Sequence, residues 1–191
     1  MSRQKNRVVF RKGKKVILRP ICENDLERFL VWENDPELAK FFSDALPIYR
    51  EEERDWLRKI HKDKNNHVVF AIDTIKGKNI GSVGLHRINW ISRHSSLGIM
   101  IGNKKYWSNG YGTDAMMTIL EFAFNSLNFH KVNLSVLSSN PRGHRCYVKC
   151  GFVDDGCRKQ QFFKNGIWVD EITMSCFQAD WKQVWEQYQN Q

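Results

Sequence analysis

The stretch from Leu97 to Phe124 constrains the fold of this chain most, because it reads as a strand, a glycine loop and a helix in direct succession. Leu97, Ile99 and Ile101 alternate as one buried face of a strand does. The glycines of Asn109-Gly110-Tyr111-Gly112-Thr113 then precede apolar residues at helical spacing. The first turn of a helix carries unpaired N–H groups and partial positive charge, and glycine lets the backbone approach a phosphate closely. The stretch therefore predicts either an anion-binding loop or a helix whose N-terminus only needs flexible residues.

Two common phosphate-binding motifs do not fit this stretch. A P-loop needs four residues between its glycines and then Gly-Lys-Ser/Thr, and the dinucleotide fingerprint needs a third glycine within a βαβ unit. The segment W-S-N-G-Y-G instead resembles the pyrophosphate-binding motif Q/R-x-x-G-x-G/A of the GCN5-related N-acetyltransferases, the GNAT superfamily. Trp107 stands at the Gln/Arg position, as is common in the RimJ/RimL-type branch, which acetylates ribosomal-protein N-termini and polyamines. The match to that branch is therefore closer than to the superfamily.

A second segment carries the same resemblance. Residues 140–152, N-P-R-G-H-R-C-Y-V-K-C-G-F, resemble the family's signature N-x-R-S-x-x-x-Y-x-K-x-G-F in register, with Gly143 in place of the usual Ser. A single helical Tyr before K-x-G-F is more often a packing residue, but two motifs at the proper separation favour the functional interpretation. The resemblance implies that Asn140 binds the pantetheine arm and that Tyr147 lies near the thioester sulfur as general acid.

The resemblance implies an enzyme that transfers an acetyl group from acetyl-CoA to a primary amine. The expected catalytic residues are Tyr147 and Asn140. The residues expected to bind acetyl-CoA are Ile99, Met100, Ile101, Trp107, Ser108, Asn109, Gly110, Tyr111, Gly112, Thr113, Asn140, Arg142, Tyr147 and Lys149. The residues expected to bind the acceptor are Trp32, Phe41, Phe42, Ser43, His86 and Ser96, although Phe41 and Phe42 also fit a purely structural role in the core.

The sequence does not identify a general base, because Ser96 stands where many relatives carry Glu. His86, His94, Glu33 and Asp44 are all candidates by expected proximity. A protein α-amine with a pKa of about 8 is already neutral in roughly one molecule in ten at pH 7, whereas a lysine-like amine is not. A weak base and no visible acidic cluster therefore favour a protein N-terminal amine, of the ribosomal-protein type, as acceptor. The alternatives are a small amine, such as a polyamine, amino sugar or antibiotic, and a non-catalytic CoA- or RNA-binding protein.

The net charge of +9 is concentrated at the N-terminus. Residues 1–19 hold eight basic and no acidic residues, which leaves 22 basic against 21 acidic residues in the rest of the chain. This arm is predicted either to be a solvated terminus or to contact RNA or a ribosome with salt-dependent affinity. Five cysteines without a C-x-x-C pair, and no long apolar segment, predict a cytoplasmic protein with reduced thiols, no metal site and no membrane association.

The chain length and the order of elements predict a single α+β domain. The resemblance implies a mixed, mostly antiparallel central sheet of about seven strands with helices on both faces. Helices are expected from Asp25 and from Arg50, and hairpin turns at Gly77 and at Asn165-Gly166. We expect a basic arm at 1–15 that includes part of a β-hairpin, an N-acetyltransferase domain at 16–176, and an amphipathic helix at 177–191. The oligomeric state stays open, and a homodimer is among the alternatives.

Overall fold

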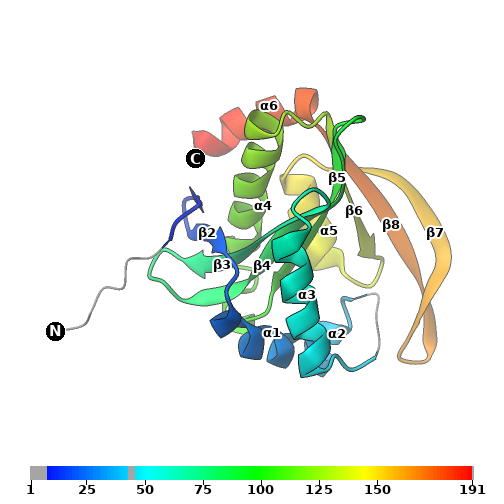
Figure 1. Cartoon of the computed structure of the whole chain (residues 1–191). Helices are drawn as coiled ribbons and strands as arrows, with labels where there is room; N and C mark the ends of the chain where they lie inside the picture. Colours follow the sequence, from blue (N-terminus) through cyan, green and yellow to red (C-terminus); the bar gives the residue numbers. More distant parts are fainter. Residues whose placement is uncertain (1–7, 43–45, 191) are drawn as a thin grey trace.

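A computed structural model describes residues 8–42 and 46–190, which form one eight-stranded sheet with helices on both faces (Figure 1). The strand order is β1-β2-β3-β4-β5-β6-β8-β7, and all neighbours are antiparallel except β5 and β6. The expected α+β class and mixed sheet are confirmed, with a two-residue edge strand as an addition. The strands are β1 (Arg11–Lys12), β2 (Val16–Pro20), β3 (His67–Thr74), β4 (Asn79–Asn89), β5 (His94–Ile101), β6 (Lys131–Leu137), β7 (Val153–Lys164) and β8 (Ile167–Phe177).

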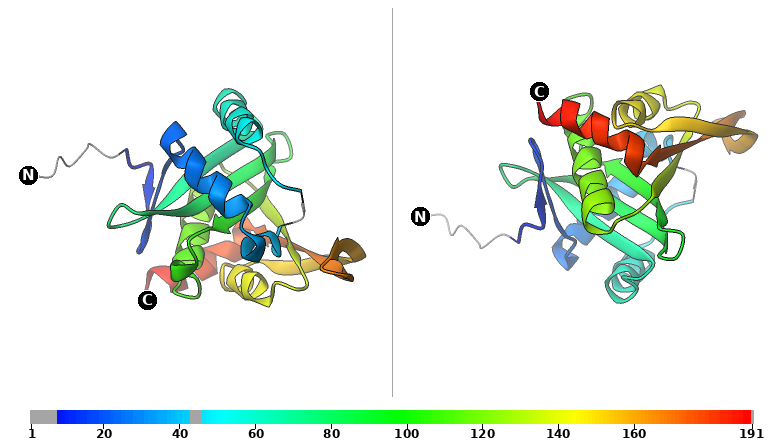
Figure 2. Two further views of the ribbon diagram at one scale, coloured as in Figure 1. Left: turned by 90° about the horizontal axis from the view of Figure 1, so that it is seen from below. Right: turned by 90° about the horizontal axis from the view of Figure 1, so that it is seen from above.

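The helices divide between the two faces of the sheet. Figure 2 shows α1, α2 and α3 on one face and α4, α5 and α6 on the other. No helix within 8–42 or 46–190 is long and apolar enough to cross a membrane. The α-helices are α1 (Leu26–Glu33), α2 (Pro36–Ala39), α3 (Arg50–Lys62), α4 (Tyr111–Glu121), α5 (Pro141–Lys149) and α6 (Gln178–Gln189); η1 (Glu23–Asp25) and η2 (Lys104–Tyr106) are 3-10 turns, and η3 (Phe122–Ser126) is a π-helical continuation of α4.

Strand alternation places a hydrophobic core on each side of the sheet. On β3, Phe70 and Ile72 face α4, whereas Ala71 between them joins the core formed with α1 and α3. Each core is closed by fully buried side chains, such as Met116 on one side and Phe29 on the other. Burying a side chain of this size contributes about 1.5–3 kcal/mol. The two cores therefore hold α4 and α1 firmly against opposite faces of the same strands.

The sheet opens between its two parallel strands. β5 and β6 pair only at His94–Lys131, Ser95–Val132 and Ser96–Asn133. Beyond that point β5 stays paired with β4 as far as Ile101, and β6 stays paired with β8 as far as Leu137. The two strands therefore diverge after Ser96, and the backbone of β5 from Leu97 onward has no ladder partner on the β6 side.

The local turns agree with the sequence predictions. Gly77 in the β3–β4 turn has a φ of 92°, and Asn165 and Gly166 in the β7–β8 turn have φ values of 51° and 86°. Two consecutive positive φ values are those of a type I′ turn, which matches the right-handed twist of the two strands. Both predicted hairpins are confirmed.

The part of the basic arm that the structure describes is fastened to the domain. β1 (Arg11–Lys12) pairs with β2 in a hairpin. The buried Asp114 carboxylate accepts the backbone N–H groups of Lys14, Lys15 and Val16 at 2.9, 2.7 and 2.8 Å. The basic residues at positions 3, 5 and 7 lie outside the described residues.

Candidate active site

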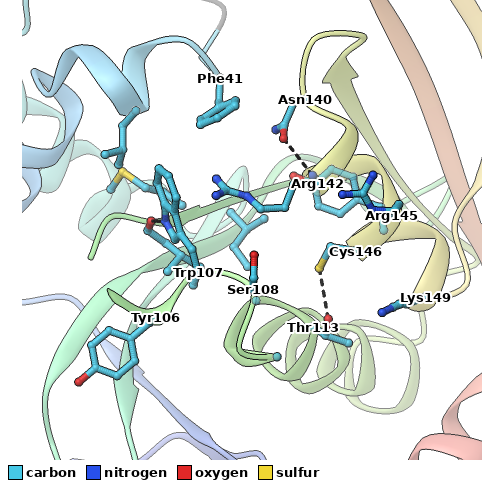
Figure 3. A pocket seen from close by; sticks show the side chains of 18 of the residues that line it. Phe41, Tyr106, Trp107, Ser108, Thr113, Asn140, Arg142, Arg145, Cys146 and Lys149 are labelled. Atoms are coloured by element: carbon cyan, nitrogen blue, oxygen red, sulfur yellow. Dashed lines mark hydrogen bonds between the residues drawn. The ribbon is translucent and has the colours of Figure 1, made fainter. Parts of the chain in front are cut away.

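A cavity of about 380 Å³ lies at the mouth of α4, where β5 and β6 diverge (Figure 3). Its walls come from β5, from the glycine loop, from α5 and from the end of the α2 segment. Most residues predicted to bind acetyl-CoA meet here. The lining residues are Leu38, Phe41, Phe42, Ile99, Met100, Ile101, Tyr106, Trp107, Ser108, Gly110, Gly112, Thr113, Asn140, Arg142, Gly143, Arg145, Cys146, Tyr147 and Lys149.

The glycine loop forms one end of this first cavity. Gly110 is the N-cap of α4 with a φ of 80°, a left-handed conformation in which a Cβ is strained. The Lys15 ammonium group donates a hydrogen bond to the Asn109 carbonyl at 2.9 Å, which ties the loop to the N-terminal hairpin. The first-turn N–H groups of α4, from Tyr111 to Thr113, point out of the helix toward the cavity. The loop therefore has the geometry of an anion-binding helix N-terminus.

Packing at the N-terminus of α5 explains why glycine stands at position 143, where the family motif has serine. The Asn140 side chain caps α5 by accepting the Gly143 N–H at 2.9 Å. A Cβ at Gly143 would lie 2.6 Å from Asn140 Nδ2, closer than real Cβ atoms come to their neighbours. The glycine therefore gives the Asn140 amide room to fold over the first turn of α5.

Trp107 supports a cation at the end of β5. Its indole N–H donates to the Ile101 carbonyl at 2.5 Å, which fixes the ring. The Arg142 guanidinium carbon lies 3.7 Å from the centroid of the nearest Trp107 ring and 5.1 Å from that of Phe41. Figure 3 shows Arg142 reaching across the cavity toward Trp107. A tryptophan at the Gln/Arg position of the motif thus holds an arginine by a cation–π contact.

One face of α5 lines the first cavity with positive charge. Arg142, Arg145 and Lys149 recur at spacings of three and four, so they share one side of the helix. Three cations beside a helix N-terminus suit the phosphate groups of a nucleotide. Arg145 and Cys146 were not predicted as site residues, although this helical spacing was a signal that could have found them.

A second cavity, of about 890 Å³, lies on the other side of Tyr147. It shares Phe41, Phe42, Ile99, Met100 and Tyr147 with the first cavity. Its remaining walls come from elements far apart in the sequence, and include Glu33 of α1, His86 of β4 and Phe163 at the tip of the β7–β8 hairpin. The two cavities therefore form one cleft, and they meet at β5, Tyr147 and the two phenylalanines.

Tyr147 is the titratable side chain common to both cavities. Burial raises the pKa of its hydroxyl, and the neighbouring Cys146 and Cys150 thiols raise it further. The hydroxyl therefore keeps its proton throughout the neutral range and can donate it to a group in the cleft.

A pair of carboxyl groups adjoins the second cavity. Burial, and then the charge and hydrogen bond of Glu53, raise the pKa of Glu33 to about 8. Burial also raises the pKa of Glu53, whose side chain lies in the first turn of α3. The two neighbouring carboxyls, one half-buried and one buried, resist double ionisation because like charges close together disfavour it. The raised pKa of Glu33 keeps that carboxyl mostly protonated at neutral pH, and the pair corrects the expectation that the site lacks an acidic cluster.

The pKa of His86 is shifted in the direction opposite to that of Glu33. Burial, and then the positive charges of His67 and Arg87, lower its pKa to about 4. Its Nδ1 atom lies 3.3 Å from Nδ1 of His67. His86 is therefore neutral at neutral pH and is a poor proton acceptor compared with Glu33.

Several predicted site residues lie away from the cavities. Trp32 is 9% exposed, packs in the α1–α3 core against Gly102 and lines neither cavity. Ser96 pairs with His86 across β4 and β5, but lines neither cavity. Asn109 and Tyr111 flank the glycine loop without lining the first cavity. The predicted Ser43 and the candidate base Asp44 lie outside the described residues.

Comparisons with known proteins agree with this geometry. The family model described as an acetyltransferase (GNAT) domain matches residues 15–153, which include the glycine loop and α5. A spermidine N(1)-acetyltransferase of Vibrio cholerae is 28% identical over 163 residues, covering 85% of this chain and 92% of that protein. A putative ribosomal N-acetyltransferase of Bacillus subtilis, YdaF, is 25% identical over 175 residues, covering 87% and 93%.

A solved structure shares the whole arrangement. The crystal structure of spermidine N-acetyltransferase from Vibrio cholerae in complex with CoA and spermine has a TM-score of 0.81 to this chain. The two are 26% identical, and the alignment covers 87% of this chain and 98% of that one. The relatives thus include both acceptor classes of the branch expected from the sequence, so the resemblance is confirmed for the superfamily and not for the ribosomal type.

Proposed function

From the premise that this chain belongs to the acetyltransferase (GNAT) family and is an N-acetyltransferase that uses acetyl-CoA, we propose that its acceptor is a small cationic amine of the polyamine type. In this proposal the first cavity is the donor cavity and the second is the acceptor cavity. Tyr147 and β5 lie where the two substrates meet.

The carboxyl pair of Glu33 and Glu53 carries this proposal. A protonated amine that enters the acceptor cavity meets this carboxyl pair in a partly desolvated setting, where the ammonium group favours ionisation of Glu33 and a charge pair is stronger than in water. A protein N-terminus needs no such charge, because its amine is partly neutral at pH 7. The sequence-based preference for a protein N-terminus depended on the apparent lack of acidic groups, and the pair reverses it.

The chemistry follows from groups of the cleft. Backbone N–H groups of β5 beyond Ser96 that face away from β4 hydrogen-bond the thioester carbonyl and stabilise the oxyanion that forms on attack. Glu33, once ionised, accepts a proton from the ammonium group, and its raised pKa suits this role better than the lowered pKa of His86. Tyr147 donates its hydroxyl proton to the departing thiolate.

Thiol release from acetyl-CoA tests the acceptor class. The assay compares spermidine and spermine with an amino sugar and with peptides that carry a free N-terminal amine. We expect release with polyamines at a kcat/KM at least ten times that with any peptide. Faster release with the peptides would restore the protein N-terminus as acceptor, and no release with any amine would favour a non-catalytic CoA-binding protein.

The variant Glu33→Gln tests the observation that carries the proposal. It should raise the KM for spermidine about tenfold or more and leave the KM for acetyl-CoA within about twofold, because only the acceptor cavity loses a carboxyl group that can ionise beside the amine. Glu51→Gln is the matched control, since Glu51 is an exposed residue of the first turn of α3. Equal effects of the two substitutions would contradict the role of Glu33.

A further inference from the structure

Two thiols of α5 contact the first turn of α4 beside the glycine loop. The Cys146 sulfur lies 3.4 Å from the Thr113 hydroxyl oxygen and lines the donor cavity. The Cys150 sulfur, one helical turn later, lies 3.8 Å from the Thr113 carbonyl oxygen. Cys150 is fully buried, whereas Cys146 is partly exposed to the cavity. Figure 3 shows the Cys146 side chain directed at Thr113.

The surroundings of Cys146 favour the thiolate. The neighbouring Cys150 thiol and Thr113 hydroxyl and the positive charge of Lys149 together lower the pKa of Cys146 to about 7 against the opposing effect of burial. The N-terminus of α4 adds a further positive potential at the same place. Low-pKa, accessible thiols beside a second thiol are the ones that peroxides oxidise.

We propose that Cys146 is a site of reversible oxidation by hydroperoxides, with Cys150 as the resolving thiol, and that its oxidation closes the donor cavity to acetyl-CoA. The inference depends on the assignment of the first cavity to acetyl-CoA. None of the functions proposed above for the cleft uses either thiol.

The chemistry balances in two steps. The Cys146 thiolate attacks the terminal oxygen of a hydroperoxide; the O–O bond breaks, the sulfur is oxidised to sulfenic acid, and the alkoxide or hydroxide leaves with a proton from solvent. The Cys150 sulfur then attacks the sulfenic sulfur; the S–O bond breaks, and the leaving hydroxide takes the thiol proton as water. Residues four apart in a helix have Cα atoms about 6 Å apart, within the range that a disulfide spans, but their Cβ atoms are about 5–6 Å apart and must approach to about 4 Å. The bond therefore requires the last turn of α5, which Cys150 caps, to unwind. A dithiol reductant reverses the second step and returns both thiols.

Oxidation competes with the donor for the same space. A Cβ at Gly112 would lie 3.7 Å from the Cys146 sulfur, an ordinary van der Waals contact, so the space between the sulfur and the anion-binding turn is about one methyl group wide. An oxygen added to the sulfur would fill that space, beside the turn proposed to hold the donor phosphates. Drawing Cys146 toward Cys150 also moves α5 side chains relative to the loop. Acetyl-CoA in the cavity covers the same sulfur and protects it.

The test measures CoA binding by calorimetry before and after treatment of the full chain with hydrogen peroxide. We expect the Kd for CoA to rise at least tenfold, dithiothreitol to restore it, and CoA present during treatment to prevent the change. The variant Cys146→Ser should keep its own untreated Kd through the same treatment. The matched control Cys157→Ser removes an exposed thiol of β7 and should stay as sensitive as the unmodified chain.

Two further results decide the proposal. Cys150→Ser should accumulate a sulfenic acid at Cys146 that dimedone traps and peptide mass spectrometry locates; absence of that adduct would overturn the resolving role of Cys150. An equal rise in Kd for Cys146→Ser and the unmodified chain would overturn the role of Cys146. Failure of the untreated chain to bind CoA would instead contradict the assignment of the donor cavity, so the two failures are distinguishable.

Discussion

Replacement of Asp114 by alanine should destabilise the fold more than any surface carboxylate does. The Asp114 side chain is 2% exposed and accepts three backbone N–H groups, those of Lys14, Lys15 and Val16, as well as the Tyr188 hydroxyl. It therefore joins the N-terminal hairpin and the C-terminal helix α6 to the first turn of α4. Without it the three donors at the start of β2 lose their acceptor.

The magnitude follows from burial. Val16 is fully buried, so its orphaned N–H costs about 2 kcal/mol, and the two partly buried donors cost about 1 kcal/mol each because water reaches them. The expected loss is about 4 kcal/mol, a large share of the 5–15 kcal/mol by which domains are typically stable. With a urea m-value of about 2 kcal/mol/M, the midpoint of unfolding should fall by roughly 2 M.

Urea unfolding followed by tryptophan fluorescence measures this change, since the chain has seven tryptophans. Asp55→Ala is the matched control: the Asp55–Arg58 pair is 72% and 65% exposed, so its loss should cost less than about 1 kcal/mol. Asp114→Asn keeps one acceptor oxygen and should fall between the two. A midpoint for Asp114→Ala within 0.5 M (~1 kcal/mol) of the control would refute the reasoning.

Four more substitutions test the cleft. Tyr147→Phe should lower kcat about a hundredfold with little change in CoA affinity, because only proton donation is lost; an unchanged kcat in the thiol-release assay would remove Tyr147 from this role. The kcat/KM for spermidine should rise with pH through about 8, because the raised pKa of Glu33 means that its carboxyl ionises only in that range. In a pH–rate profile, the variant Glu33→Gln should lack this rise in kcat/KM. Gly143→Ser should raise the KM for acetyl-CoA severalfold because the Asn140 amide must move; a lowered KM would show that the hydroxyl is accommodated. Gly110→Val should cost about 1–2 kcal/mol in thermal unfolding because its φ is 80°, and no loss would contradict the strain argument.

The donor side of the cleft was predictable because its signals are local. The glycine loop, the helix that follows it and the cap of α5 each depend on residues within one or two turns of each other, so spacing alone indicates their geometry. The same holds for the turn at Asn165-Gly166. Arg145 shows the limit: it shares a helix face with Arg142 and Lys149, but only the cavity shows that this face is the functional one.

The carboxyl pair on the acceptor side was not predictable, because its two groups meet only through tertiary packing. Glu33 ends α1 and Glu53 lies in the first turn of α3, and the α1–α3 contact brings them together. In the sequence Glu53 is one of three consecutive glutamates that read as a solvated, dipole-complementing first turn. Trp32, which was predicted to bind the acceptor, packs in the core and lines neither cavity.

The two departures from the family motifs have related physical causes. Relative to the family motifs, Trp107 replaces a polar Gln or Arg side chain, and Gly143 replaces a serine and its hydroxyl. In the structure, Trp107 bonds the Ile101 carbonyl and holds the Arg142 guanidinium, while Gly143 frees the space in which Asn140 caps α5. Arg142 and Asn140 are separated by a single residue at the N-terminus of α5, so the departures together position both side chains at the edge of the donor cavity. Restoring Ser at position 143 alone would therefore disturb an arrangement that Trp107 supports, and its effect on acetyl-CoA binding should be smaller when the Trp107 platform is also removed.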